Sequence, residues 1–371
     1  MKILIDLTSL ADNFSGIERF ALSITKELVL DQSRSDIEYI LVFKNEVHKE
    51  FVIERNNVKK IVIKGKNKLI FNQLQLPLMI ATIKADYYFF PAFPAPFFFF
   101  NRNAISAIHD VGCWDCPSKN KGYMTLYFKL MYWKASLGKK KVVTVSEFSK
   151  KRISEILNKN PNEIVVIYDG LSDVFKHFEY NEKKNMSAIN KYNLSKNYLL
   201  CLSTVEPRKN MKLLIEAYSQ LIKENKVDVD LVLAGRKGWL VDDLMSGLDE
   251  AVIKRIKFTG FIDEELLPYV YYNAGVFVFP SIYEGFGVPP IEAMSLGIPV
   301  ISSNAASLPE VLGKAAIYFK NCNCTDLKKK IIEVLSMDEN ELNERKKCGI
   351  KQAYSFDWKS EALKLRNEVF K

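Results

Sequence analysis

Two glutamates, Glu284 and Glu292, are separated by seven residues and follow an apolar segment that is typical of a buried strand. Gly285 and Gly287 free the backbone on either side of Phe286, and a proline beyond them suits a first helical position because its φ is preset. We therefore expect a loop that becomes a helix, with Glu292 in its first turn. Carboxylates accept directed hydrogen bonds, so the pair fits the recognition of sugar hydroxyls. Solvent exposure and complementation of the helix dipole remain open as alternatives.

A basic pair, Arg208 and Lys209, follows the apolar segment Tyr198–Ser203 where a loop returns to a helix. In open parallel sheets ligands bind beyond the carboxyl ends of the strands. A forked guanidinium beside an ammonium can hold a diphosphate by bidentate contact and by point charge. A solvated basic turn is the alternative that the residues alone leave open.

Two residues in the first half of the chain occupy comparable places. Gly16 precedes a helix, where backbone N–H groups favour an anion, although a single loop glycine also fits a plain turn. His109, followed by Asp110, ends a buried strand, which neither of the other two histidines does. Cys113 and Cys116 have redox-motif spacing but lack the surroundings of a zinc site, so we assign them no function.

Short apolar segments alternate with longer amphipathic ones along the whole chain, which is the pattern of βα units around parallel sheets. Several segments are apolar on both faces, as buried parallel strands are. The sequence therefore predicts two α/β domains. The expected strands are Ile3–Leu7, Tyr39–Phe43, Ile61–Ile63, Tyr87–Phe90, Ile105–His109, Val142–Val145 and Ile164–Tyr168 in the first, and Tyr198–Ser203, Leu231–Ala234, Lys257–Thr259, Val276–Pro280, Val300–Ser302 and Ile317–Phe319 in the second.

The length of 371 residues also favours two domains, because single cores stop growing at roughly 250–300 residues. Residues 177–196 are charged, rich in asparagine and poor in large apolar side chains, so we expect a linker there. The domains would then be 1–176 and 197–350. The amphipathic end, 351–371, predicts a final helix that packs on one of them.

The net charge of +9 points to an anionic partner and is unevenly distributed. Residues 119–152 carry ten basic side chains and one acidic one, interleaved with aromatic and leucine residues. Such a helix is typical of a peripheral contact with an anionic membrane, although a partly buried helix with a solvated basic face would look similar. No signal peptide, spanning helix or disulfide scaffold is apparent, so a cytoplasmic protein is expected.

Beyond these features, the chain resembles the family 4 glycosyltransferases, which are retaining enzymes of the GT-B fold. The segment EGFGVPPIEAM resembles their E-x7-E motif, and LSTVEPRKNMKLLIEAY resembles the branch that carries EPRKN. Further blocks, among them SGIERF, AIHDVGCWD, TVSEFSK, LVLAGRKGW and GIPVISSNAASLPEVLGKAAIYF, extend the likeness over nearly the whole chain. One departure is that Ser203 and Thr204 stand where many members carry Gly-Arg, which moves the phosphate role to Arg208.

The resemblance implies two Rossmann-like parallel-sheet domains facing a central cleft, the first on the acceptor side and the second binding a nucleotide-sugar. The final helix would pack toward the first domain. It also implies the roles of the site residues: diphosphate binding by Gly16, Arg208 and Lys209, base lining by Phe261 and Ile262, donor sugar and ribose binding by Glu284, Gly285, Phe286, Gly287 and Glu292, and catalytic contact by His109 and Glu284.

We therefore expect a retaining glycosyltransferase that moves a hexosyl or deoxyhexosyl unit to a lipid-linked or growing polysaccharide acceptor, as in O-antigen, capsule or lipopolysaccharide synthesis. No histidine-carboxylate cluster indicates a metal, so neither a metal nor another cofactor is expected. The enzyme would work at the inner face of the cytoplasmic membrane. Another GT-B enzyme, such as a sugar-nucleotide epimerase or a phosphorylase, is the alternative. A nucleic-acid-binding protein is a remote one, because only the basic charge favours it and no nucleic-acid motif is present.

Overall fold

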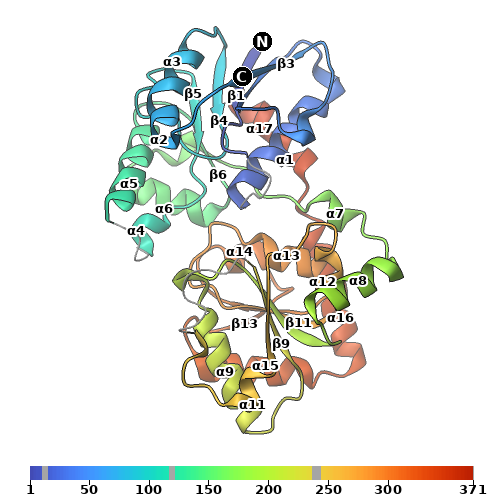
Figure 1. The fold of residues 1–371 in the computed structure, drawn as a ribbon. Coiled ribbons are helices and arrows are strands. Elements are labelled where there is room, and N and C mark those ends of the chain that lie inside the picture. The colour runs from blue at the N-terminus through green and yellow to red at the C-terminus, as the bar shows by residue number, and fades with distance from the viewer. Residues whose placement is uncertain (11–15, 117–121, 236–243, 371) are drawn as a thin grey trace. The chain divides into compact units, whose positions relative to one another are not determined.

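The computed structural model describes residues 1–10, 16–116, 122–235 and 244–370 and divides into two compact units. Unit 1 comprises Met1–Gly170 together with Asp357–Lys371, and unit 2 comprises Leu171–Phe356. Each unit contains one parallel β-sheet with its connecting helices (Figure 1). The prediction of two α/β domains built on parallel sheets is therefore confirmed.

Unit 1 is built on a seven-stranded sheet of order β3-β2-β1-β4-β5-β6-β7, in which every neighbouring pair is parallel. Strands β5 and β6 are buried along their entire length, which explains why their sequences are apolar or small on both faces. The strands are β1 (Lys2–Asp6), β2 (Glu38–Lys44), β3 (Val58–Ile63), β4 (Tyr87–Phe90), β5 (Ala104–Ala107), β6 (Val142–Thr144) and β7 (Ile164–Val166).

Helices connect these strands and cover the sheet. They are α1 (Gly16–Leu30), α2 (Lys68–Ile70), α3 (Leu76–Ala81), α4 (Gly112–Asp115), α5 (Gly122–Ser136) and α6 (Glu147–Leu157), with a π-helical turn η3 (Phe71–Gln75) joining α2 to α3 and 3-10 turns η1 (Gln32–Arg34), η2 (Lys49–Phe51) and η4 (Pro161–Glu163). The last helix of the chain, α17 (Trp358–Val369), also belongs to unit 1. Its Trp358 ring packs edge-on against Phe20 of α1, and its Arg366 guanidinium binds the carboxylate of Asp31.

Unit 2 is built on a six-stranded parallel sheet of order β10-β9-β8-β11-β12-β13. All of the strands expected from the sequence are present in the two sheets. Those of unit 2 are β8 (Tyr198–Leu202), β9 (Leu231–Ala234), β10 (Ile256–Gly260), β11 (Ala274–Phe279), β12 (Val300–Ser303) and β13 (Ile317–Phe319).

The core of unit 2 lies between the central strands and the amphipathic helices α9 and α15, whose apolar stripes are buried against them. The described helices are α7 (Asp173–Lys176), α8 (Glu182–Tyr192), η5 (Pro207–Lys209), α9 (Met211–Lys223), α11 (Glu250–Ile253), α12 (Leu267–Tyr272), α13 (Val288–Ser295), α14 (Leu308–Leu312), α15 (Cys324–Leu335) and α16 (Glu339–Ala353). Because β8 and β11 are neighbours and parallel, the loops that follow them leave the same edge of the sheet.

The linker expected over 177–196 needs correction. The segment contains helix α8, which belongs to unit 2, and the chain passes between units at Gly170–Leu171 and at Phe356–Asp357. Asn181 caps the helix by accepting a hydrogen bond from the Lys184 amide, and Ala188 and Tyr192 are buried. The charged residues of the segment occupy the exposed face of this short amphipathic helix, which is why the composition looked like that of a linker.

Candidate functional site

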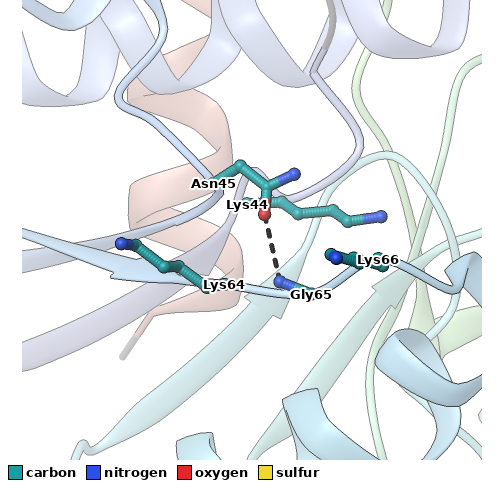
Figure 2. A pocket seen from close by; sticks show the side chains of 5 residues that line it. All are labelled: Lys44, Asn45, Lys64, Gly65 and Lys66. Carbon is teal, nitrogen blue, oxygen red and sulfur yellow. Dashed lines mark hydrogen bonds between the residues drawn. The ribbon is translucent and has the colours of Figure 1, made fainter.

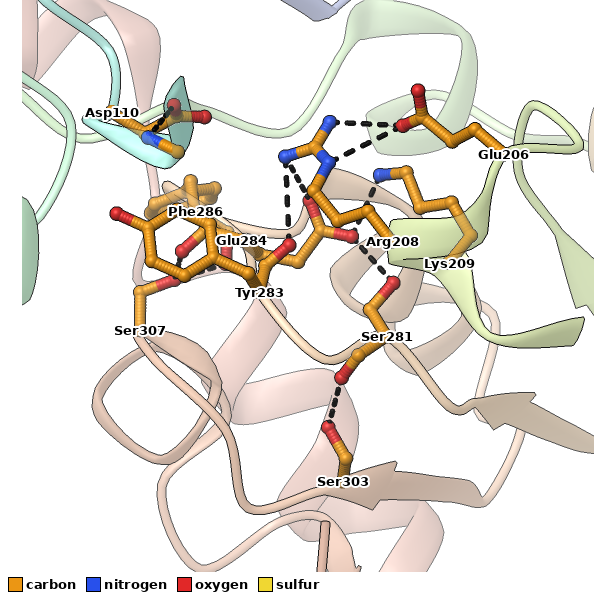
Figure 3. Close-up of polar contacts among 11 residues, drawn as sticks. Asp110, Glu206, Arg208, Lys209, Ser281, Tyr283, Glu284, Phe286, Ser303 and Ser307 are labelled. Carbon is orange, nitrogen blue, oxygen red and sulfur yellow. Dashed lines mark hydrogen bonds and ion pairs between the residues drawn. The ribbon is translucent and has the colours of Figure 1, made fainter. Parts of the chain in front are cut away.

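The loops after β8 and β11 bring Lys209 and Glu284 into direct contact (Figure 3). Lys209 ends the 3-10 turn η5, and the Lys209 ammonium donates a 2.7 Å hydrogen bond to Glu284 Oε1. Both side chains are largely withdrawn from solvent. The same ammonium lies 5.8 Å from the centre of the Phe279 ring. A cation and an anion separated by 75 residues in the chain are thus paired at the edge of the sheet.

Arg208 lies on the other side of the Glu284 carboxylate. Its Nη1 is 3.7 Å from Glu284 Oε2, and its Nε and Nη2 donate to Glu206 Oε1 at 3.3 and 3.1 Å. The backbone also joins the two loops, because the Ile282 amide donates to the Arg208 carbonyl at 2.9 Å. Glu206 thereby orients the guanidinium fork, which remains partly exposed.

The charge of Glu284 is set by two opposing effects. Burial raises its pKa, but the positive charges of Lys209 and Arg208, with hydrogen bonds from Lys209 and Ser281, outweigh burial, so the pKa of Glu284 lies below its ordinary value. Glu284 is therefore an ionised hydrogen-bond acceptor near neutral pH. It has no proton to donate there, which excludes a general-acid role in this arrangement.

Three serines hold the loop of Glu284 in place, and the sequence did not single them out (Figure 3). Ser281 donates to Glu284 Oε1 at 2.6 Å, and Ser303 donates to the carbonyl of Ser281. The Ser307 hydroxyl lies 3.0 Å from the Glu284 carbonyl and 3.1 Å from the Phe286 carbonyl. The placement of Ser281 and Ser303 at the carboxyl ends of β11 and β12 was the available signal, since that edge binds ligands in parallel sheets.

The predicted motif residues between the glutamates shape the start of helix α13. Phe286 is buried and packs edge-on against Phe356, with ring centres 5.2 Å apart. Gly287 has φ of 104°, and a Cβ at this position would lie 2.8 Å from Leu308 Cδ2. Both the backbone conformation and the lack of space require glycine here. The helix then starts with Pro289 near its first position, as the sequence predicted.

Glu292 lies deeper than expected. It is the fifth residue of α13, which begins at Val288, and so it belongs to the second turn rather than the first. Its buried carboxylate accepts a 2.9 Å hydrogen bond from the Tyr271 hydroxyl, and the same hydroxyl lies 3.3 Å from the Pro289 carbonyl. Tyr271 is therefore a further partner of the motif that sequence reasoning missed.

The two residues predicted to line a base follow strand β10 and differ in exposure. Gly260 has φ of 72° and ends the strand, Phe261 is half exposed, and Ile262 is buried. The Gly260 carbonyl accepts a 2.9 Å hydrogen bond from the Gly235 amide, which fixes the loop to the end of β9. Of this pair, Phe261 offers an exposed aromatic face.

Two of the predicted site residues, His109 and Gly16, belong to unit 1. His109 is buried, its Nε2 lies 2.9 Å from the Pro91 carbonyl, and its ring packs edge-on on Phe20. Burial lowers the pKa of His109 despite this hydrogen bond and the nearby Asp110 carboxylate. The contact with a carbonyl requires a proton on Nε2, and the lowered pKa favours the neutral imidazole, in which Nδ1 is an acceptor. Gly16 is the first residue of α1, and a Cβ there would meet no atom within 4 Å in the part of the chain that the structure describes.

The basic segment predicted to contact a membrane contains helix α5. Tyr123, Leu126 and Trp133 of this helix are about half or more exposed, whereas Lys134 is buried and donates to the carbonyls of Pro96 and Phe99. Burial, together with the charge of Lys140, lowers the pKa of Lys134 to about 8. Residues 119–121, and the part of the LVLAGRKGW block at 236–239, lie outside the described residues.

Neither of the two cysteines with redox-motif spacing is part of a disulfide in the described residues. Burial, with the neighbouring Asp110 carboxylate, raises the pKa of Cys113 to about 12, which makes it a poor nucleophile. Within the described ranges, no group of three or more histidine, cysteine or acidic side chains is arranged to hold a metal ion. No helix in the described part of the chain is long and apolar enough to cross a membrane.

Comparison with known proteins places this geometry in a family context. Residues 182–353 match the family described as glycosyl transferases group 1, a range that contains Arg208, Lys209, Glu284 and Glu292. The O-antigen chain mannosyltransferase B of Escherichia coli is 28% identical over 379 residues, which covers 97% of each chain. The serotype-specific mannosyltransferase WbdA of Escherichia coli is 30% identical over 224 residues, or 60% of this chain and 27% of that protein.

Similarity to solved structures extends over both units. The crystal structure of Anabaena Alr3699/HepE in complex with UDP-glucose matches with a TM-score of 0.74 and 16% identity, covering 99% of this chain and 98% of that chain. At this identity the likeness demonstrates a shared fold. The residues that gather around Glu284 therefore belong to a fold in which another protein has been crystallised with a nucleotide-sugar.

Proposed function

We propose that this chain, which belongs to the glycosyl transferases of group 1 and has the GT-B fold, transfers a hexosyl unit from a nucleotide-sugar to a lipid-linked or growing polysaccharide acceptor. Glycosyl transfer follows from the family. The sugar, the acceptor, retention of configuration and independence of metal are the proposed parts, and the last two rest on the resemblance of the EPRKN and E-x7-E motifs.

The observation that carries the donor site is the contact of Lys209 and Arg208 with an ionised Glu284 at the carboxyl edge of the sheet in unit 2. A diphosphate has the charge and the oxygen acceptors to bind the ammonium and the partly exposed guanidinium. The same cations would stabilise the nucleoside diphosphate as negative charge develops on it during departure. Both loops are held by hydrogen bonds, so little reorganisation is needed when the donor binds.

Other parts of the donor would contact the residues of the E-x7-E segment. Glu284 would accept hydrogen bonds from hydroxyls of the transferred sugar, and the backbone N–H groups at Gly285, Phe286 and Gly287 would approach sugar and phosphate. Glu292, whose carboxylate already accepts the Tyr271 hydroxyl, would hold the ribose hydroxyls. A carboxylate has two oxygens with about four lone-pair sites, so it can accept several hydrogen bonds at once.

Three further residues complete the proposed donor contacts. The exposed Phe261 ring would stack on the base, with Ile262 packed behind it. From unit 1, Gly16 would let the backbone at the start of α1 approach the diphosphate, and neutral His109 would contact the donor sugar. His109 can accept a hydrogen bond through Nδ1 while the Pro91 carbonyl holds Nε2.

Mannose is the sugar that the relatives favour. Both Escherichia coli proteins described above are named as mannosyltransferases, and one acts in O-antigen synthesis. We therefore place the chain in the synthesis of an O-antigen or a similar surface glycan. A lipid-linked acceptor would require the enzyme at the inner face of the cytoplasmic membrane, where the exposed apolar side chains and lysines of residues 122–152 could contact anionic lipid.

A ligand screen followed by product analysis tests the proposal. Thermal unfolding is measured with UDP-, GDP- and dTDP-sugars, because a ligand that binds the native state raises its apparent stability. The sugar that stabilises the wild type is then offered with a lipid-linked glycan, and the anomeric configuration of the product is read by NMR. Stabilisation that survives in a Lys209→Ala, Glu284→Ala double variant would contradict the site, and an inverted product would contradict retention.

A further inference from the structure

The helical segment from α2 to α3 exposes an apolar face that sugar transfer does not use. Residues 69–83 contain no charged side chain. Leu69, Leu74 and Leu78 are 62%, 51% and 71% exposed, while Phe71 on the opposite side is fully buried in the core of unit 1. Several large apolar side chains exposed along one short uncharged helical segment are typical of an interface rather than of a surface in water.

This apolar face continues onto two neighbouring segments of unit 1. Gln73 connects them, because its Nε2 donates to the Tyr127 hydroxyl of α5 at 2.6 Å and its Oε1 accepts the Phe97 amide at 2.8 Å. Figure 1 shows α2 and α3 beside α5. Phe98 and Phe100, in the loop that Gln73 holds, are 56% and 79% exposed. The exposed leucine and aromatic side chains therefore belong to segments that Gln73 holds together.

A hollow of about 520 Å³ lies beside this surface and is lined by Lys44, Asn45, Lys64, Gly65 and Lys66 (Figure 2). In the described residues no carboxylate forms an ion pair with any of the three lysines, and Glu46, the nearest acidic residue in sequence, is not part of the lining. Lys44 and Lys66 extend to one side of the hollow and Lys64 to the other (Figure 2), so positive charge without a carboxylate partner surrounds it and attracts an anion.

Hydrogen bonds hold the backbone around the hollow, and this backbone packs against the apolar segment. Asn45 has φ of 65°. Its backbone N–H donates to the Ile63 carbonyl, and its side-chain Oδ1 accepts the backbone N–H of Gly65, each at 3.0 Å. A Cβ at Gly65 would lie only 2.3 Å from Phe71 Cδ2, and the Lys44 ammonium lies 4.9 Å from the centre of the same ring. The lysine loops and the start of the apolar helix are thus held against each other through Phe71.

From this arrangement we infer that the hollow of Lys44, Lys64 and Lys66 binds the phosphate of an anionic membrane phospholipid, while the apolar face of α2–α3 lies among its acyl chains. The ligand must be amphipathic, because an anion site and an exposed apolar helix adjoin. A free phosphate or a nucleic acid would use the lysines but leave the leucines in water. The inference deepens the membrane contact proposed above and does not depend on the sugar transferred.

Flotation of the full chain with lipid vesicles tests this inference. We expect binding to vesicles of phosphatidylcholine with phosphatidylglycerol, and weak binding to phosphatidylcholine alone, in ~0.1 M salt where charges beyond about 10 Å are screened. Since each lysine near an anionic surface contributes about 5-fold, a Lys44→Gln, Lys64→Gln, Lys66→Gln variant should bind about 100-fold more weakly. Leu74→Gln with Leu78→Gln should weaken binding to the same vesicles, because exposed polar groups replace the inserted leucines.

The control removes the same charge elsewhere. Lys183, Lys196 and Lys226 are exposed lysines of unit 2, and their joint change to Gln should leave flotation within a few-fold of wild type because screening limits distant charges. Equal loss in both triple variants would overturn the inference in favour of net charge. Displacement by inorganic phosphate, at ionic strength matched with chloride, would overturn it in favour of a free phosphate.

The same experiment separates this inference from the broader membrane contact. Wild-type flotation that is lost on changing Lys129 and Trp133 of α5 but not on changing the three hollow lysines would retain the contact and refute the phosphate site. No flotation of wild type with either vesicle would refute both. Circular dichroism of each variant establishes that it is folded, and all substituted side chains of the hollow and the apolar face are at least partly exposed.

Discussion

The Lys209 ammonium and the Glu284 carboxylate lie 2.7 Å apart, each in a loop that follows a central strand of the unit 2 sheet. Either charge alone would destabilise the folded protein, because a buried carboxylate or ammonium without its partner loses hydration without compensation. The pair therefore links the integrity of the site to its charge balance. A donor diphosphate would enter a site where Arg208 and Lys209 already share a carboxylate.

Removal of one member of the pair should lower the free energy of unfolding more than removal of both charges does. Lys209→Met leaves Glu284 buried with less compensation, and we expect a loss of roughly 3 kcal/mol in the free energy of unfolding. Lys209→Met combined with Glu284→Gln should recover part of that loss, since the uncompensated charge is gone. A double-mutant cycle from urea unfolding measures the coupling, and additive effects would contradict it. Transfer activity should be lost in all three variants.

The charge of Glu284 predicts how stability depends on pH. Its folded pKa is lowered, so its stabilising contribution is present above the ordinary carboxyl value near 4.3 and disappears as pH falls through the folded pKa. Glu284→Gln should therefore be less stable than wild type at pH 7, and the difference should narrow as pH falls below about 4.3. Urea unfolding of both proteins across pH measures this difference. A constant difference would contradict the lowered pKa.

The Ser307 hydroxyl bonds to the carbonyls of Glu284 and Phe286, so Ser307→Ala should loosen the loop between the motif glutamates. Loss of a buried hydroxyl that satisfies backbone acceptors costs about 1–3 kcal/mol. We expect lower stability and weaker donor binding, measured by urea unfolding and by ligand titration. Ser336→Ala is the matched control, because the Ser336 hydroxyl also contacts two carbonyls but lies exposed beyond α15. Equal effects of the two changes would refute the structural role.

Gly287→Ala combines backbone strain with a close contact. The residue has φ of 104°, and its new Cβ would lie 2.8 Å from Leu308 Cδ2. Backbone strain in sparsely populated regions costs about 1–3 kcal/mol, and the contact adds to it. Gly247→Ala separates the two causes, because Gly247 also has positive φ, 78°, but no atom of the described residues lies within 4 Å of a Cβ there. Thermal unfolding should show the larger loss for Gly287→Ala, and equal losses would exclude the contact with Leu308.

The position of Gly16 allows its proposed role to be tested without damaging the fold. A methyl group at this first residue of α1 meets no atom of the described residues, so Gly16→Ala should leave thermal unfolding of the free protein almost unchanged. If the backbone at Gly16 approaches the diphosphate, the same change should weaken donor binding at least several-fold. Titration of the stabilising nucleotide-sugar measures this. Unchanged affinity would remove Gly16 from the site.

The sequence by itself determined the strands of both sheets and the local backbone of the motif. Buried parallel strands are apolar on both faces, so segments such as Leu231–Ala234 could be recognised from their own residues. The turn at Gly287 and the proline in the first turn of α13 were also predictable, because the backbone preferences of glycine and proline are local. The family likeness of the Glu284 and Arg208 segments was likewise readable from contiguous residues.

Only the tertiary structure decided which groups meet. The pairing of Lys209 with Glu284, the hydroxyl of Tyr271 on Glu292, and the contact of Gly65 with Phe71 join residues whose spacing carries no local signal or a misleading one. Composition alone indicated neither that Lys134 is buried nor that Glu182–Tyr192 form helix α8. The reason is physical: periodicity records which face of an element is buried, whereas hydrogen bonds and ion pairs depend on strand order and loop path, which are set by packing of the whole unit.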